Sequence, residues 1–191
     1  MQKIHRIDLL LIGGSAGSLK VILDVLPELK PLSFPIIIIL HRKPLQHSVL
    51  QDLLSAHTPI PVIEVEDKTM LEPGTIYIAP SDYHLLIEKN KMVTLDYSEK
   101  INHSRPSIDI CFMSAADIYK NKTCAILLSG ANSDGVDGLK LIKLNNGIAI
   151  AQSPETAEVS FMPKQAIEKV AIDYILRPEE IADFINSLND Y

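Results

Sequence analysis

The sequence predicts an α/β protein with a doubly wound, mostly parallel sheet, helices on both faces and a short antiparallel β-ribbon near residues 75–97. Short apolar runs alternate with segments of helical period along most of the 191 residues. Several of these runs, such as residues 36–40, are apolar at every position, which is typical of strands covered on both faces. We therefore expect right-handed crossovers between parallel strands, and one domain that spans residues 1–191.

The predicted strands share an apolar run bounded by glycine, proline or polar residues. They cover residues 7–12, 34–40, 62–66, 75–79, 84–88, 92–96, 124–128, 148–151 and 172–176. The predicted helices share apolar positions at three- and four-residue spacing. They cover residues 18–29, 48–56, 107–119, 134–144, 163–169 and 178–188.

Turn and capping residues set the boundaries of these elements. Pro31 ends the first helix, Pro106 introduces the helix at 107–119, and Gly147 follows the helix that ends near residue 144. Asn90 and Lys91 predict a tight turn, so the strands at 84–88 and 92–96 are expected to pair antiparallel.

Composition excludes several classes of function. A formal net charge of −6 argues against a nucleic-acid partner, which requires a basic face. No apolar run is long enough to insert into a membrane, and the N-terminus lacks the pattern of a secretory signal. Cys111 and Cys124 are isolated in apolar surroundings and are expected to be buried, reduced thiols. We therefore expect a cytoplasmic protein.

A glycine-rich turn follows the first predicted strand. Gly13, Gly14 and Gly17 surround Ser15, and a helical pattern begins directly afterwards. A strand, tight turn and helix of this kind can lift a serine hydroxyl clear of the sheet and aim backbone N–H groups at the group that it attacks. The same turn could instead hold a phosphate at the helix N-terminus.

Two more chemically active residues follow other strands. His41 comes directly after the strand at 34–40, and Asp134 lies in the loop after the strand at 124–128. Taken singly, Ser15 is more often a helix cap, His41 a loop residue and Asp134 a turn residue. Because the carboxyl ends of parallel strands share one edge of the sheet, the three together predict a nucleophilic serine with a base and an orienting carboxylate. We expect His41 Nε2 to face Ser15 and His41 Nδ1 to face Asp134.

Longer strings of residues resemble the catalytic domain of the CheB protein-glutamate methylesterases, in order, from about residue 7 to about 185. The strings are Ile12-Gly13-Gly14-Ser15-Ala16-Gly17, Leu40-His41-Arg42, Gly74-Thr75-Ile76-Tyr77-Ile78-Ala79-Pro80, His84-Leu85-Leu86, Arg105-Pro106-Ser107-Ile108-Asp109, Leu127-Leu128-Ser129-Gly130, Asp134-Gly135, Gly138, Ala151-Gln152 and Met162-Pro163. The resemblance implies Ser15 as nucleophile, His41 as base and Asp134 as orienting carboxylate.

The same resemblance implies the reaction and its partners. It implies hydrolysis of glutamate methyl esters, and deamidation of glutamines, on the cytoplasmic helical region of methyl-accepting chemotaxis receptors. The backbone N–H groups of Ala16 and Ala131 would form the oxyanion hole, and neither a metal nor a cofactor is required. No receiver domain precedes the catalytic part in this sequence, so we expect a constitutively open site or control by a regulatory protein in trans.

The sequence departs from the family pattern at the site itself. Ser15-Ala16-Gly17-Ser18 replaces the usual Ser-Thr-Gly-Gly, and Ser129-Gly130-Ala131-Asn132 replaces Thr-Gly-Met-Gly. These changes leave room for a catalytically weakened CheB-like binding or scaffold protein. A nucleotide-binding module is a further alternative, since Arg42-Lys43 could receive a phosphate, but the turn lacks G-x-G-x-x-G spacing.

The remaining histidines and Arg105 are weaker candidates. His84 and His103 lie near family motifs and could line the cleft, although loop or surface roles are favoured. His5, His47 and His57 have no geometric argument, and no pair of histidines has the HExxH spacing of a zinc site. For Arg105 a structural role at the helix entry is favoured over contact with an acidic receptor surface.

Overall fold

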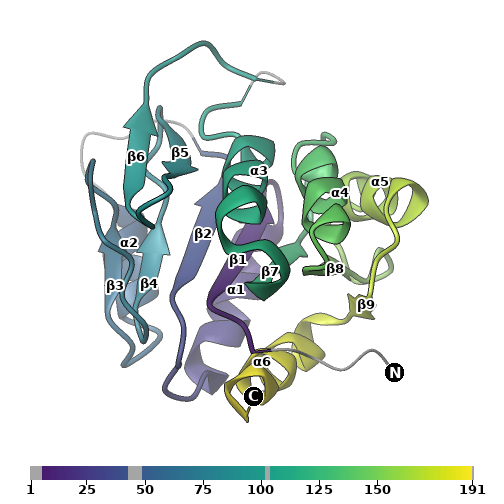
Figure 1. Cartoon of the computed structure of the whole chain (residues 1–191). Coiled ribbons are helices and arrows are strands. Elements are labelled where there is room, and N and C mark those ends of the chain that lie inside the picture. The colour runs from purple at the N-terminus through teal and green to yellow at the C-terminus, as the bar shows by residue number, and fades with distance from the viewer. Residues whose placement is uncertain (1–5, 43–48, 102–103, 191) are drawn as a thin grey trace.

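The computed structural model describes residues 6–42, 49–101 and 104–190 (Figure 1). The strands are β1 (Leu9–Gly14), β2 (Ile36–Leu40), β3 (Val62–Glu64), β4 (Ile76–Ile78), β5 (His84–Ile87), β6 (Val93–Asp96), β7 (Thr123–Leu127), β8 (Ile148–Gln152) and β9 (Tyr174–Leu176). The α-helices are α1 (Ser18–Val25), α2 (Val49–Ser55), α3 (Ile108–Tyr119), α4 (Val136–Leu144), α5 (Phe161–Lys169) and α6 (Pro178–Ser187). Single 3₁₀ turns are η1 (Leu26–Glu28), η2 (Lys120–Lys122) and η3 (Leu188–Asp190).

Among the residues described, seven strands form one parallel sheet in the order β3-β4-β2-β1-β7-β8-β9. β5 and β6 form a separate antiparallel ribbon. The predicted fold class is therefore confirmed. The ribbon lies where the turn at Asn90 and Lys91 placed it, and Lys91 has the positive φ of 64° that such a turn uses. The strand predicted at 75–79 is β4, which belongs to the parallel sheet.

Helices cover both faces of the sheet because its strands are apolar at successive positions. In β1, Leu10 and Ile12 pack into the core beneath α1, α2 and α6, whereas Leu9 and Leu11 pack into the core beneath α3, α4 and α5. Successive side chains of a strand point to opposite faces, so one uninterrupted apolar strand supplies both cores. Figure 1 shows α3, α4 and α5 together on one side of the sheet.

The chain order places a switch point at the centre of the sheet. From β1 the chain passes to β2 on one side, and later crosses to β7 on the other side. Gly14 is paired with Leu40 of β2, and Gly13 with Leu127 of β7, so the three strands end together. Ligands of open parallel sheets bind outside the carboxyl ends of strands at such a point.

None of the described helices is long and apolar enough to cross a membrane.

Candidate active site

Ser15 lies at the apex of the turn between β1 and α1. The Ser15 N–H donates to the Ser129 carbonyl at 2.9 Å, and the Ser18 N–H donates to the Ser15 carbonyl at 3.1 Å. Gly17 has φ 80° and ψ −10°, the values of the third residue of a type II turn, which favours glycine. The Ser18 hydroxyl also donates to the Ser15 carbonyl, at 2.5 Å. The backbone of Ser15 is therefore held on both sides.

The Ser15 side chain itself is left available. No side chain caps α1, so the expectation of Ser15 as a helix cap can be set aside. Ser15 is partly exposed, and its hydroxyl makes no hydrogen bond within the part of the chain that the structure describes. The loop after β7 comes close to it: a Cβ added to Gly130 would lie 3.1 Å from Ser15 Cβ.

His41 follows β2 and contacts Asp134 from the loop after β7. The His41 N–H donates to the Gly14 carbonyl at 3.1 Å, which places the histidine beside the residue that precedes Ser15. His41 Nε2 lies 2.8 Å from Asp134 Oδ2, and the Asp134 side chain is fully buried. A carboxylate can only accept, so Nε2 carries the proton and Nδ1 keeps its lone pair.

Asp134 is held at the N-terminus of α3. Its Oδ1 accepts from the Ser107 hydroxyl at 2.9 Å and from the Asp109 N–H at 3.0 Å. Its Oδ2 accepts from the Ile108 N–H at 2.8 Å, in addition to His41. Burial alone raises the pKa of Asp134, but the hydrogen bonds from His41 and from the two backbone amides outweigh burial and lower its pKa below the ordinary value. Asp134 is therefore a carboxylate that fixes the His41 ring.

The expected orientation of the His41 ring is wrong. Nε2, not Nδ1, faces Asp134, whose carboxylate is anchored on the backbone of α3. Nδ1 instead lies 3.4 Å from the Ser104 hydroxyl, in the segment that leads to α3. Ser104 is also 3.4 Å from the Asn132 side-chain amide. Nδ1 is thus the ring nitrogen able to accept a proton.

The two backbone N–H groups expected to form an oxyanion hole are free to donate. Within the described residues, neither the Ala16 nor the Ala131 N–H has a hydrogen-bond partner, and both residues are exposed. The neighbouring Gly130 N–H, in contrast, donates to the Val159 carbonyl at 3.0 Å. The Ser129 hydroxyl donates to the Ala16 carbonyl at 2.6 Å, so it links the two loops that carry these donors.

Several supporting residues lie in the strings that resemble the family, but no role of their own was predicted for them from the sequence. Gln152, at the end of β8, accepts from the Ser129 N–H at 2.9 Å and is fully buried. Ser107 caps α3, with its hydroxyl accepting from the Ile110 N–H, and the serine that follows Pro106 is a capping signal present in the sequence. Asp109 resembles an ordinary acidic residue in a first helical turn, and nothing local indicates that it is buried.

The other candidate residues lie away from the reactive groups or have structural partners. His84 is fully buried, accepts from the Ser107 N–H at Nδ1 and contacts the Glu99 carbonyl at Nε2, so it supports α3 and does not line a cleft. Arg105 binds Asp82 and the Tyr97 and Ser98 carbonyls, as its predicted structural role requires. The His57 ring contacts the Leu53 carbonyl, and its N–H donates to the Leu54 carbonyl, at the end of α2.

Other expectations concern residues that are buried or not described. Cys111 and Cys124 are buried, free thiols, as expected, and burial raises the pKa of each thiol far above its usual value. His5, Lys43, His47 and His103 lie outside the described residues.

Arg42 does not offer a free positive charge for a phosphate. Its guanidinium is paired with Glu64. Glu64 also lines a hollow of about 650 Å³ beyond β3 and β4, together with Glu66, Asp67 and Tyr83. An anionic ligand would be repelled by these carboxylates. The sequence argument for a nucleotide phosphate at Arg42 therefore loses its support.

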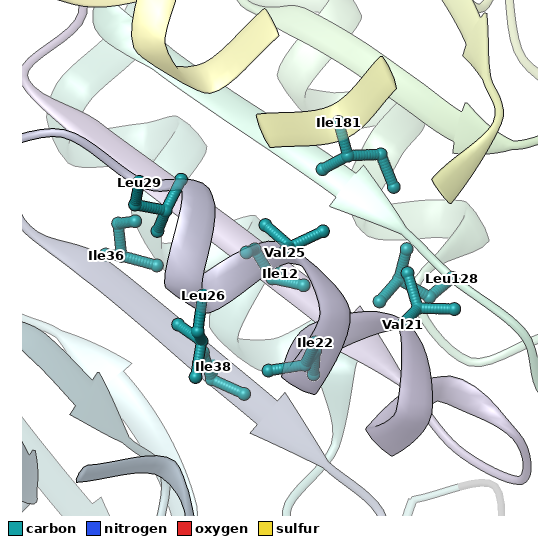
Figure 2. A pocket seen from close by; sticks show the side chains of 10 residues that line it. All are labelled: Ile12, Val21, Ile22, Val25, Leu26, Leu29, Ile36, Ile38, Leu128 and Ile181. Atoms are coloured by element: carbon teal, nitrogen blue, oxygen red, sulfur yellow. The ribbon is translucent and has the colours of Figure 1, made fainter. Parts of the chain in front are cut away.

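A second hollow belongs to the core. Figure 2 shows Val21, Val25, Ile12 and Ile181 around a cavity of about 10 Å³ between α1, β1 and α6. Its lining is wholly apolar, so a water molecule would find no polar partner there. The described residues also contain no group of three or more histidine, cysteine, aspartate or glutamate side chains arranged to hold a metal ion.

Comparisons with known proteins show what this chain is similar to. The family model described as CheB methylesterase matches residues 10–185. A relative from Leptospira interrogans is 41% identical over 182 residues, which is 94% of each chain. A relative from Thermotoga maritima named protein-glutamate methylesterase/protein-glutamine glutaminase is 37% identical over 93% of this chain, and this chain covers 54% of it.

A solved structure matches as well. The crystal structure of the Thermotoga maritima CheB methylesterase catalytic domain superposes with a TM-score of 0.90 and 35% sequence identity, covering 95% of this chain and 98% of that one. The family model, the relatives and the fold coincide over nearly the whole sequence. The chain belongs to the CheB methylesterase family.

Proposed function

We propose that this protein is a serine hydrolase that removes methyl esters from glutamate side chains, and deamidates glutamines, on methyl-accepting chemotaxis receptors. In this proposal residues 1–191 form one cytoplasmic catalytic domain. The observation that carries the proposal is the buried 2.8 Å contact between His41 Nε2 and Asp134. This contact lies at the same sheet edge as the Ser15 hydroxyl, which does not cap α1. Relatives that match this chain are named for both reactions.

The chemistry follows from these atoms. Ser15 Oγ attacks the ester carbonyl while its proton passes to His41 Nδ1, the ring nitrogen with the lone pair. Asp134 keeps the other proton on Nε2 and stabilises the imidazolium. The free N–H groups of Ala16 and Ala131 bind the oxygen that becomes negative. The C–O bond to the methoxy group breaks, and methanol leaves with the proton from Nδ1.

Water then completes the turnover. It attacks the glutamyl-serine ester, gives its proton to His41 Nδ1 and releases the glutamate carboxylate as Ser15 regains a proton. With a glutamine substrate, ammonia leaves in place of methanol. His41 can accept the proton because its Nδ1 lone pair is not used by Asp134.

The test is methanol release from a methyl-esterified receptor fragment. Wild type should release methanol, and Ser15→Ala should not. Ser133→Ala is the matched control, because Ser133 is a partly exposed serine in the loop between β7 and α4. Ser104→Ala examines the hydroxyl that lies 3.4 Å from Nδ1. Full activity of Ser15→Ala, or loss only in Ser104→Ala, would overturn the assignment of the nucleophile.

One observation favours a second function, that of a binding or scaffold protein with weak catalysis. The Ser15 hydroxyl is not hydrogen-bonded to His41, and Ala16 and Ala131 replace larger family residues. A serine-reactive fluorophosphonate discriminates between the two. Rapid labelling of Ser15 supports the hydrolase, and an inert Ser15 together with receptor binding supports the scaffold.

A further inference from the structure

A second buried carboxyl group lies behind the His41–Asp134 pair. Asp109, the second residue of α3, is only 6% exposed. Its Oδ1 accepts from the Gly138 N–H at 2.7 Å, and its own N–H donates to Asp134 Oδ1 at 3.0 Å. The proposed reaction gives Asp109 no part, although it directly contacts the carboxylate that orients the base.

Two helix N-termini exchange capping groups at this point. α4 begins after Gly135, which has no side chain to cap it, and Asp109 of α3 supplies the acceptor for Gly138 in the first turn of α4. Conversely, Asp134, in the loop before α4, accepts from the first-turn amides of Ile108 and Asp109 in α3. Figure 1 shows α3 and α4 side by side. Each aspartate thus ties its own segment to the other helix.

The packing leaves little freedom for this exchange. A Cβ on Gly138 would lie 2.4 Å from Phe112 Cβ, so α4 already touches α3 through its backbone. A shift of the α4 N-terminus would move the adjoining loop, and with it Asp134. Since His41 Nε2 is bound to Asp134, the imidazole would move or turn as well.

We propose that Asp109 is a positioning residue: by capping α4 and binding Asp134 through its amide, it fixes the orientation of the Asp134–His41 pair. The inference rests on the proposed function, because a fixed imidazole matters for proton transfer from Ser15. Asp109 itself touches neither the nucleophile nor, in the proposed scheme, the substrate.

The charges around Asp109 support a neutral carboxyl group. Burial raises its pKa to about 7, and repulsion by Asp134 and by Asp137 of α4 acts in the same direction, while the Gly138 N–H opposes both. Other titratable groups nearby are His41, which contacts Asp134, His84, which binds the Ser107 N–H, and the buried thiol of Cys111, whose pKa is raised by burial and by Asp134. Asparagine keeps an uncharged side-chain acceptor for the Gly138 N–H.

The experiment compares variants by two readouts. Asp109→Asn keeps the acceptor for the Gly138 N–H, whereas Asp109→Ala removes it, and Asp109→Val removes it while filling the space. Asp137→Asn is the charge control, since Asp137 is exposed and pairs with Lys140. The readouts are the ¹⁵N shifts of the His41 ring, which report the protonated nitrogen, and kcat and KM per active site.

We expect Asp109→Asn and Asp137→Asn to keep the wild-type ring shifts and a kcat within about threefold. In Asp109→Ala and Asp109→Val the signal of a fixed Nε2–H should be lost, and kcat should fall by up to about 100-fold with a smaller change in KM, as for a catalytic group displaced by about 1 Å. Wild-type ring shifts and kcat in whichever of these two variants folds would overturn the inference. If wild type itself hydrolyses no ester, the proposed function fails, and the ring shifts alone still decide the role of Asp109.

Discussion

Replacing Asp134 by asparagine changes one atom of a carboxylate that has four donors. Oδ2 accepts from His41 Nε2 and the Ile108 N–H, and Oδ1 accepts from the Ser107 hydroxyl and the Asp109 N–H. In either orientation of the amide, its NH₂ group meets a backbone N–H of α3. One buried donor left without an acceptor costs about 1–3 kcal/mol of unfolding free energy. Asp134→Asn should therefore fold with reduced stability.

The effect of Asp134→Asn on activity should be larger than its effect on stability. When the NH₂ group occupies the Oδ2 position, it donates to His41 Nε2, so the ring proton moves to Nδ1 and the base loses its lone pair. A wrong tautomer of this kind lowers kcat by about 10⁴-fold, which corresponds to about 5 kcal/mol of transition-state stabilisation. A fall in kcat that is much larger than the loss of unfolding free energy would show that Asp134 orients His41. A residue that only supports packing would lose stability and keep kcat.

The assay measures kcat on a methyl-esterified receptor fragment, divided by the folded fraction from urea unfolding. Asp173→Asn is the matched control, because the Asp173 carboxylate accepts from Lys143 Nζ at 2.6 Å and from the Ala149 N–H at 2.8 Å, and has no contact with His41. It should lose stability and keep kcat. Failure of triad orientation costs far more than tenfold in kcat. If Asp134→Asn retains more than about a tenth of the wild-type kcat per folded molecule, the orienting role is therefore refuted.

Three further predictions concern stability, measured by urea unfolding. As pH rises from about 4 to 7, wild type should lose unfolding free energy relative to Asp109→Asn. The reason is that the folded wild type, with the Asp109 pKa raised to about 7, holds a proton that the unfolded chain has lost. A difference between the two proteins that is constant with pH would contradict this. Gly17→Ala should cost about 1–2 kcal/mol for the left-handed backbone. Its Cβ would also lie 2.5 Å from Glu158 Cβ, so truncation of Glu158 to glycine, which removes that Cβ, should recover only the steric part, and full recovery would exclude backbone strain. His84→Phe should cost about 1–3 kcal/mol, because the buried Ser107 N–H loses its acceptor, and an unchanged midpoint would show that the amide finds another partner.

Much of the fold could be predicted because its signals are local. Buried parallel strands such as β2 are apolar at every position, and the helices between them have clear periodicity. The grouping of Ser15, His41 and Asp134 also followed from the sequence, since residues after neighbouring parallel strands meet at one edge of the sheet.

The orientation of the groups could not be predicted in the same way. Which nitrogen of His41 faces Asp134 depends on where the Asp134 carboxylate is anchored. That anchor is the N–H of Ile108 in α3, which lies 26 residues before Asp134 in the chain. The burial of Asp109 likewise depends on α4 packing across α3, which no local pattern reports. From the local sequence, Asp109 is an acidic residue in a first helical turn. Only the contact between α3 and α4 makes it a buried cap.

The proposed mechanism makes Ser15 the nucleophile, activated by His41 and Asp134. Mass spectrometry of the protein after reaction with a fluorophosphonate gives a direct test, because the adduct marks the reactive hydroxyl. We expect an adduct on Ser15 in wild type that forms far more slowly in Asp134→Asn. An adduct on Ser104, or equal rates of labelling at Ser15 with and without the Asp134 carboxylate, would contradict it.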